Sequence, residues 1–302
     1  MSSISAPASP APRWLGLISV VLAAVLFAGK GVLVRMAYQH GADATGLLGI
    51  RLALSLPVFA ALAWWMGRKA APLTPVQWTR LISGGILGYH LASWLNFLGL
   101  ERVEVALERV ILFIYPTLLV AWALARGQRS VDKTLVIGLA MTVGGIALTW
   151  GDRALAAQAD TVGVLLVAAS AVAFAASLVI NEPDAKALGG IRSTSIAMTA
   201  ACVTGLVHAL VARPSGADLP HGTVLGLGAA LAIGATIVPT LLMGLAIEHL
   251  GAARTAVAGS IAPALTALLG WATLGEVLGP LGWLGIAATT AGAVVAGRPR
   301  GP

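Results

Sequence analysis

The sequence predicts an all-α membrane protein with ten transmembrane helices, arranged as two inverted five-helix repeats. Three observations predict this fold: the composition, the recurrence of long apolar segments, and an internal repeat. Of 302 residues, 58% are hydrophobic and 10% are charged, and the mean hydropathy is +0.90. In soluble domains, about 25% of the residues are charged. The single cysteine, Cys202, offers neither a disulfide framework nor a cysteine metal site.

Ten segments are long and apolar enough to cross a bilayer core, which needs about 20 helical residues. They cover residues 14–37, 46–66, 78–100, 104–124, 131–150, 162–181, 192–212, 223–247, 253–274 and 280–297. The first is too long for the apolar part of a cleaved signal peptide and should remain as a helix. Residues 1–13 and 298–302 are expected to be short tails.

The basic residues predict the orientation of these helices. Twelve lie in the tails and every second loop, and four lie in the other loops, so both termini are expected to be cytoplasmic. The twelve are Arg13, Arg68, Lys69, Arg80, Arg126, Arg129, Lys133, Lys186, Arg192, Arg254, Arg298 and Arg300, and the four are Arg35, Arg102, Arg153 and Arg213.

An internal repeat recurs at an offset of 147 residues and aligns residues 14–150 with residues 162–297. The matching pairs are Gly16 with Gly163, Phe27 with Phe174, Glu101 with Glu248, Pro116 with Pro263, Gly138 with Gly285, and Gly145 with Gly292. A repeat with an odd number of spans must insert its second copy upside down. The interface of such repeats commonly holds a transport site near the bilayer midplane.

Several short motifs, in register with this topology, resemble the EamA-domain branch of the drug/metabolite transporter superfamily. They are Leu98-Gly99-Leu100, the stretch from Leu107 to Thr117, Ala262-Pro263 and Leu274-Gly275-Glu276. The first half departs from the family pattern, because Arg126-Gly127-Gln128 stands where Leu-Gly-Glu is usual, and a loop carboxylate is lost. The resemblance implies a multipass secondary transporter of the bacterial inner membrane, often an exporter of amino acids or other small metabolites.

Four predicted helices place polar side chains in one layer on the outer side of the midplane. At 1.5 Å per residue, Lys30, Arg51, Asn96 and Glu108 lie roughly 6–10 Å inside the outer helix ends. Lys30, Arg51 and Arg109 are the three basic residues assigned to span interiors, whereas the other sixteen are assigned to loops or the tail. The equivalent positions in the second half hold neutral residues, so the charged side chains of any pocket should come from the first half alone.

Intramembrane charges commonly mark a binding site, so this layer predicts a site for an anion or a zwitterion. A guanidinium matches a carboxylate or phosphate bidentately, and Glu108 could hold a substrate amine or a coupling proton. The alternative is structural: Glu108 neutralises Arg51 or Lys30 across helices, or Lys30 reaches the outer interface. Because adjacent helical residues point about 100° apart, Glu108 and Arg109 are not assumed to pair.

Aromatic residues extend the candidate substrate site. His90, Ser93, Trp94 and Phe97 share one helical face, where His90 could titrate near neutral pH, and Tyr115 precedes Pro116. The alternative for His90, Trp94 and Tyr115 is ordinary packing in the helix bundle. Pro57, Pro116, Pro239 and Pro263 could kink their helices. Glycines in the fifth and tenth spans predict close packing within the molecule, with dimer formation as the alternative.

Motif searches exclude several other functions. There is no HExxH, GxSxG, GxGxxG or phosphate-loop pattern, so we expect no catalytic residue, metal or cofactor, and no ATP-hydrolysing domain. The expected partners are the lipid bilayer, a small-molecule substrate and a coupling proton, with no nucleic acid, in a monomer or a homodimer. A sugar-phosphate or nucleotide-sugar exchanger is the nearest alternative, and an intramembrane enzyme or a passive channel are more distant ones.

Overall fold

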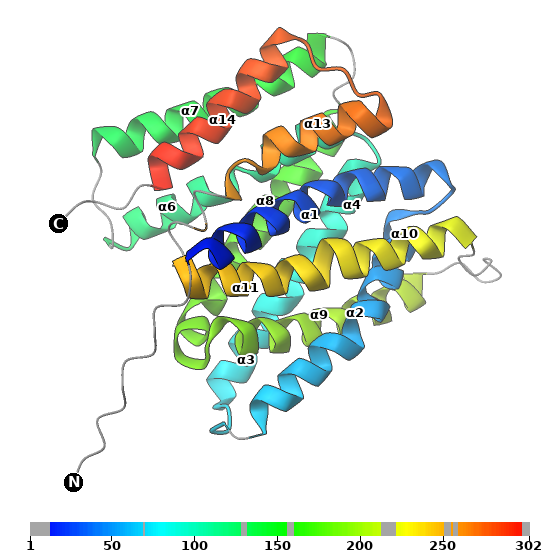
Figure 1. The fold of residues 1–302 in the computed structure, drawn as a ribbon, viewed down its shortest axis with the longest axis vertical. Coiled ribbons are helices and arrows are strands. Elements are labelled where there is room, and N and C mark those ends of the chain that lie inside the picture. The colour runs from blue at the N-terminus through cyan, green and yellow to red at the C-terminus, as the bar shows by residue number, and fades with distance from the viewer. Residues whose placement is uncertain are drawn as a thin grey trace.

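The computed structural model describes residues 13–68, 70–127, 132–155, 160–212, 222–250, 255 and 259–297. Figure 1 shows that these residues form a layered bundle of helices. The first half contains α1 (Arg13–Gln39), α2 (Ala44–Gly67), α3 (Pro75–Gly85), the π-helix η1 (Ile86–Leu91), α4 (Ala92–Leu100), α5 (Val105–Leu112), α6 (Tyr115–Ala125) and α7 (Lys133–Leu155). The second half contains α8 (Thr161–Leu188), α9 (Gly190–Ala212), α10 (Gly222–Ala232), the π-helix η2 (Ile233–Ile237), α11 (Val238–Leu250), α13 (Ala262–Leu274) and α14 (Pro280–Gly297).

Long apolar helices dominate the described chain and make it a multipass membrane protein. Seven helical segments have the length and composition to cross a membrane, while α13 and α14 are apolar but shorter. Large side chains such as Trp64, Trp65 and Leu165 are about two-thirds exposed, at 66%, 67% and 63%. A soluble protein rarely exposes so much contiguous apolar surface, whereas a bilayer covers it.

Local structure recurs at the same offset of 147 residues as the sequence repeat. The π-helices begin at Ile86 and Ile233, and α7 and α14 begin at Lys133 and Pro280. Helices α6 and α13 begin at Tyr115 and Ala262, each followed by a proline in the first helical turn. The two halves therefore share their helix starts and their helix irregularities, although few residues are identical between them.

The expected single helix over residues 104–124 is divided into α5 and α6. Phe113 and Ile114 form the turn between them. Pro116 has no N–H to donate, and its ring would clash with the carbonyl of Leu112 in a continuous helix. The break lets the two pieces differ in environment, because seven of the eight residues of α5 are buried, whereas α6 has no buried residue. Pro57, by contrast, lies inside the continuous helix α2.

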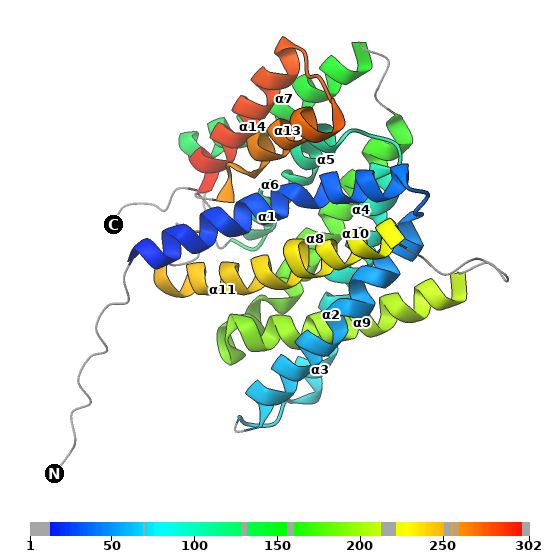
Figure 2. The same cartoon turned by 45° about the vertical axis from the view of Figure 1, so that its right-hand side comes forward.

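Glycines allow close packing of α7 against α14, which lie side by side in Figures 1 and 2. A Cβ atom at Gly138 would lie 2.6 Å from the backbone nitrogen of Ala296, and one at Gly145 would lie 2.3 Å from Thr289 Oγ1. Gly285 faces Thr149 in the same way, at 2.2 Å. These glycine faces therefore pack within the molecule, as the sequence predicted, and bring the last helices of the two halves together.

The remaining helices also pack across the two halves. Helix α2 lies against α9, α1 lies against α11 and α13, and α4 lies against α8. Figure 2 shows α1 between α13 and the α10–α11 segment. Leu52, Phe97 and Cys202 belong to the largest buried cluster and come from α2, α4 and α9. This core surrounds the polar side chains described next.

Candidate functional site

A buried polar network joins α1, α4 and α5. The ammonium group of Lys30 donates a hydrogen bond to Asn96 Oδ1 at 2.7 Å, and Asn96 Nδ2 donates to Glu108 Oε1 at 2.7 Å. Lys30 Nζ lies 3.5 Å from the same carboxylate oxygen. Glu108 is completely buried and the Lys30 side chain is 14% exposed. Three of the residues singled out in the sequence thus form one connected group.

Arg109 joins this group from the adjacent position on α5. Its Nη2 donates to the carbonyl oxygen of Phe27 at 2.6 Å, and its Nε lies 3.9 Å from Glu108 Oε2. The separation of neighbouring side chains around a helix keeps this ion pair long. Glu108 Oε2 and Arg109 Nε have no hydrogen-bond partner among the described residues. Both atoms are buried, and the described residues leave their hydrogen-bonding capacity unused.

Small residues let α1 approach α5 closely at this point. A Cβ atom at Gly31 would lie 3.3 Å from Val105 Cβ and 3.6 Å from Glu108 Oε2. Thr266 of α13 also donates to α1, with Oγ1 3.3 Å from the carbonyl oxygen of Ala28. The middle of α1 is thus held by polar contacts from both halves of the chain.

Arg51 lies in a second polar group, formed by α2, α4 and the second half. Its Nε donates to Thr236 Oγ1 at 2.7 Å and its Nη1 donates to Ser93 Oγ at 3.2 Å, while its guanidinium carbon lies 5.7 Å from the centre of the Phe97 ring. Among the described residues, Arg51 forms no ion pair with Glu108. The structural alternative named Arg51 or Lys30 as the partner of Glu108, and the structure shows the contact with Lys30.

His90 and Trp94 meet a residue that the sequence did not single out, His208 of α9. His90 Nε2 lies 3.1 Å from His208 Nδ1, and the Trp94 ring contacts the His208 ring edge-on with centroids 4.9 Å apart. Trp94 Nε1 also donates to Thr45 Oγ1 at 3.0 Å. The shared face of His90, Ser93, Trp94 and Phe97 therefore contacts both Arg51 and His208. Only the helix packing reveals His208, because it is an isolated histidine in an apolar segment.

Tyr115 has aromatic surroundings. Its ring contacts Phe174 edge-on with centroids 5.2 Å apart, and Phe113 with centroids 6.1 Å apart. Among the described residues, Tyr115 forms no hydrogen bond with Lys30, Asn96 or Glu108. The structure thus places seven of the eight predicted site residues in polar groups, and Tyr115 in an aromatic cluster.

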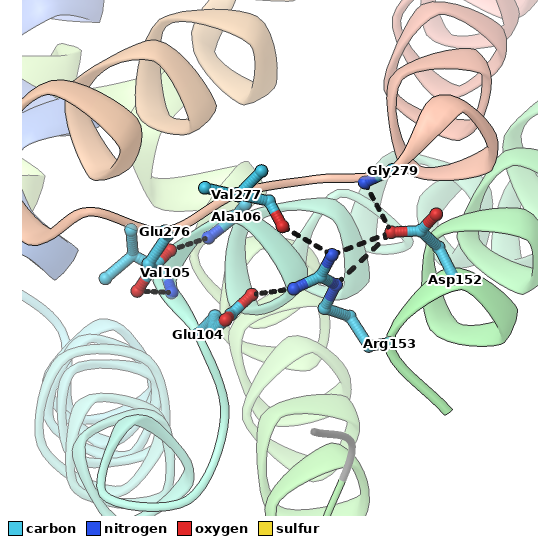
Figure 3. A network of polar contacts seen from close by, with 8 residues as sticks. All are labelled: Glu104, Val105, Ala106, Asp152, Arg153, Glu276, Val277 and Gly279. Atoms are coloured by element: carbon cyan, nitrogen blue, oxygen red, sulfur yellow. Dashed lines mark hydrogen bonds and ion pairs between the residues drawn. The ribbon is translucent and has the colours of Figure 1, made fainter. Parts of the chain in front are cut away.

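A further network, missed in the sequence, lies where α5 begins and α7 ends (Figure 3). Arg153 donates to Glu104 Oε2 at 2.8 Å, to Asp152 Oδ2 at 2.8 Å and to the carbonyl oxygen of Val277 at 2.7 Å. Asp152 Oδ2 also accepts from the backbone N–H of Gly279 at 3.0 Å. Arg153 was expected in a loop, but it lies within α7 and is 3% exposed. The segment between α13 and α14 is thereby attached to the first half.

Glu276 supplies the N-terminal cap of α5 from the other half of the chain. Its carboxylate oxygens accept from the backbone N–H groups of Val105 at 3.0 Å and Ala106 at 3.4 Å (Figure 3). Glu104, the residue at the N-cap position, makes no side-chain capping bond. Burial raises the pKa of Glu276. Glu276 belongs to the Leu-Gly-Glu motif, so this motif has a structural role here. Gln128, its first-half counterpart, lies outside the described residues.

A cavity of about 670 Å³ lies between α1, the α10–η2 segment and α13. Its lining includes Val25, Gly29, Ile233 and Leu269, and Thr273 is its one polar residue. None of the eight predicted site residues lines it. This cavity is therefore not the charged chamber expected from the sequence, although Gly29 places it next to Lys30.

Comparisons with known proteins show the family through a family model, and the listed relatives are named as transporters. The model of the EamA-like transporter family matches twice, over residues 14–151 and 161–298. The uncharacterized transporter YcbK of Bacillus subtilis is 29% identical in an alignment of 280 positions that covers 87% of this chain and 86% of that protein. The uncharacterized transporter sll1319 of Synechocystis is 25% identical in an alignment of 305 positions that covers 91% of each chain.

One solved crystal structure shares the fold with a TM-score of 0.65 at 19% identity, and the alignment covers 94% of this chain and 98% of the other. The two family matches begin 147 residues apart, which is the offset of the helix starts. The chain belongs to the EamA-like transporter family of the drug/metabolite transporter superfamily.

Proposed function

We propose that this protein is a secondary active transporter that exports small anionic or zwitterionic metabolites, such as amino acids, by alternating access. The observation that carries the proposal is the buried carboxylate of Glu108. It accepts from Asn96 and lies within 4 Å of Lys30 and Arg109, yet its second oxygen accepts no hydrogen bond from the described residues. A charged group with spare bonding capacity at such a position is typical of a ligand site.

The charges of this region favour an anionic group on the substrate. Lys30, Arg51 and Arg109 supply three cations, and Glu108 supplies one carboxylate. Guanidinium groups bind carboxylates through two parallel hydrogen bonds, while a carboxylate such as Glu108 binds an ammonium group. An amino acid carries both a carboxylate and an ammonium group, so it matches these three cations and one carboxylate better than a simple anion does.

Alternating access requires two units that can move against each other. We propose that the chain forms ten spans in two inverted repeats, residues 14–150 and 162–297, with both termini on the cytoplasmic side of a bacterial inner membrane. The recurrence of the helix starts supports this arrangement, as does the position of the start of α1 and the end of α14 on the same side of the bundle in Figures 1 and 2. Arg51 bonds to Thr236 of the second half and so links the charged layer to the repeat interface.

The test is counterflow of radiolabelled L-amino acids in proteoliposomes. Arg51→Gln and Glu108→Gln should each abolish counterflow, because they remove the groups proposed to bind the substrate carboxylate and amine. Arg126→Gln is the matched control, since Arg126 contacts Trp122 at the end of α6, away from this site. Wild-type counterflow in both site variants would refute the site. Counterflow of sugar phosphates but not of amino acids would replace the substrate class.

A further inference from the structure

The pair formed by His90 and His208 joins the two halves of the chain. His90 belongs to the π-helix η1, whereas His208 belongs to α9, and their ring nitrogens are 3.1 Å apart. The other two histidines in the described chain, His40 and His249, form ring hydrogen bonds with carbonyl oxygens one turn back in their own helices. Single π-helical turns inside α-helices occur frequently at functional sites.

The chemistry of two facing imidazoles limits how many protons they hold. A hydrogen bond between them needs one N–H donor and one bare nitrogen. One added proton preserves this bond, because an imidazolium donates to a neutral imidazole. A second added proton would place two donors and two positive charges face to face and break the bond. The pair therefore has two hydrogen-bonded states that differ by one proton. His90 Nδ1, moreover, is buried without a hydrogen-bond partner among the described residues.

The packed helices leave this pair separate from the carboxylates. Trp94 of α4 contacts the His208 ring, and Gly205 of α9 leaves room for the His90 ring, 3.3 Å from the position of a Cβ atom. The charged groups on the neighbouring helices have other contacts: Arg51 of α2 with Thr236 and Ser93, Arg80 of α3 with Asp184 of α8, Lys186 of α8 with Glu182, and Arg192 of α9 with the carbonyl of Ala71.

The pair is nevertheless connected to the charged layer. Ser93 precedes Trp94 on α4 and accepts a hydrogen bond from Arg51. Leu52, the next residue after Arg51, lies 2.2 Å from the position of a Cβ atom on Gly205, so α2 and α9 are closely packed there. A change in the His90–His208 contact would therefore shift α4 and α9 relative to each other and displace the side chain of Arg51.

We propose that His90 and His208 together bind the one proton that couples transport to the proton gradient, while Glu108 and the cations bind the substrate. This assignment rests on the proposed transport function and adds its coupling ion. The pair takes up a proton from one side of the membrane and releases the same proton to the other side. Glu108 is less suited to this task, because the cations of Lys30 and Arg109 and the hydrogen bond from Asn96 hold it as a carboxylate, the form that binds an ammonium group.

The test separates exchange from gradient-driven transport in proteoliposomes, with a mixture of radiolabelled L-amino acids as the probe. His208→Gln should retain counterflow but lose accumulation driven by an imposed pH difference, and His90→Gln should also lose this accumulation. His40→Gln should keep both activities. Gradient-driven accumulation in both pair variants at the wild-type level would overturn the proposal. So would loss of counterflow in His208→Gln, or a wild-type protein that shows counterflow but does not respond to the pH difference.

A second measurement needs no substrate. In protein labelled at histidine, the NMR signals of His90 and His208 should titrate together, and His208→Gln should change the titration midpoint of His90. Independent titrations that do not respond to the substitution would also overturn the proposal. Failure of the substrate site has a different signature, because Arg51→Gln and Glu108→Gln would then keep counterflow whatever the histidine variants do.

Discussion

Glu108→Gln removes one buried charge with little change in shape. The new side chain keeps an oxygen that can accept from Asn96 Nδ2, which donates to Glu108 at 2.7 Å. It leaves the cations of Lys30 and Arg109 in place, at positions 3.5 Å and 3.9 Å from the former carboxylate oxygens. The substitution therefore tests how much the fold depends on the ionic contacts, separately from packing.

The distances set the size of the effect. An ion pair at 3.5 Å gains about 5 kcal/mol at an effective dielectric constant of about 20, before desolvation is subtracted. Removing one partner of a buried pair costs about 3–5 kcal/mol, because the other charge remains buried without compensation. Lys30→Met removes that orphaned charge, so we expect the double variant Lys30→Met/Glu108→Gln to recover about 2 kcal/mol relative to the sum of the single losses.

The assay is a double-mutant cycle on the free energy of unfolding in detergent, followed by circular dichroism. The exposed pair of Glu182 and Lys186 on α8 provides the matched control, because its side chains are 55% and 75% exposed. Glu182→Gln should have almost no effect. If the losses of Lys30→Met and Glu108→Gln simply add, the two residues do not interact as the structure indicates, and the electrostatic account of the site is wrong.

Three further predictions concern packing and pH, all measured by the free energy of unfolding. Gly145→Ala should cost about 1–3 kcal/mol, because its Cβ would meet the Thr289 hydroxyl at 2.3 Å, whereas Gly144→Ala, with open space around it, should not. Burial raises the pKa of Glu276, so the contribution of Glu276 to the free energy of unfolding is complete below pH 4.5 and is lost as the pH rises through the folded-state pKa. Glu276→Gln should abolish this loss of stability. A hydrogen bond from the backbone N–H of Gly163 in α8 lowers the pKa of Asp160, so the contribution of Asp160 to the free energy of unfolding is complete above pH 3.8 and is lost as the pH falls through the folded-state pKa. Asp160→Asn should weaken this pH dependence of stability.

Sequence patterns were enough to predict a helical membrane protein and its repeat. Apolar segments longer than a bilayer requires leave few other structures open, because every backbone polar group in lipid must be bonded internally. The π-helices η1 and η2 begin at Ile86 and Ile233 and so recur at the same offset of 147 residues, but no sequence pattern indicated them. The proline at position 116 indicated a kink, but not that the helix would end at that point.

The candidate site was predicted in part, for a physical reason. A charge in an apolar segment is costly, so Lys30, Arg51 and Glu108 could be recognised individually. Their partners could not, because contacts between helices depend on rotation and depth, which sequence spacing leaves undetermined. His208 and Thr236 belong to the second half and reach the first half only through packing.

The sequence alone thus determined that this chain lies in a membrane and that its two halves are repeats of one helical arrangement. It also determined that a few charged residues in apolar segments are the candidates for function. Tertiary structure decided which charges meet: Glu108 contacts Lys30 through Asn96, while Arg51 bonds to Thr236 instead. It also decided that Glu276 caps a helix of the opposite half. The hydrophobic effect is non-directional, so it can be recognised from the order of residues along the chain. Hydrogen bonds and ion pairs require atoms within about 3–4 Å of each other, and only the packing of the helices sets those distances.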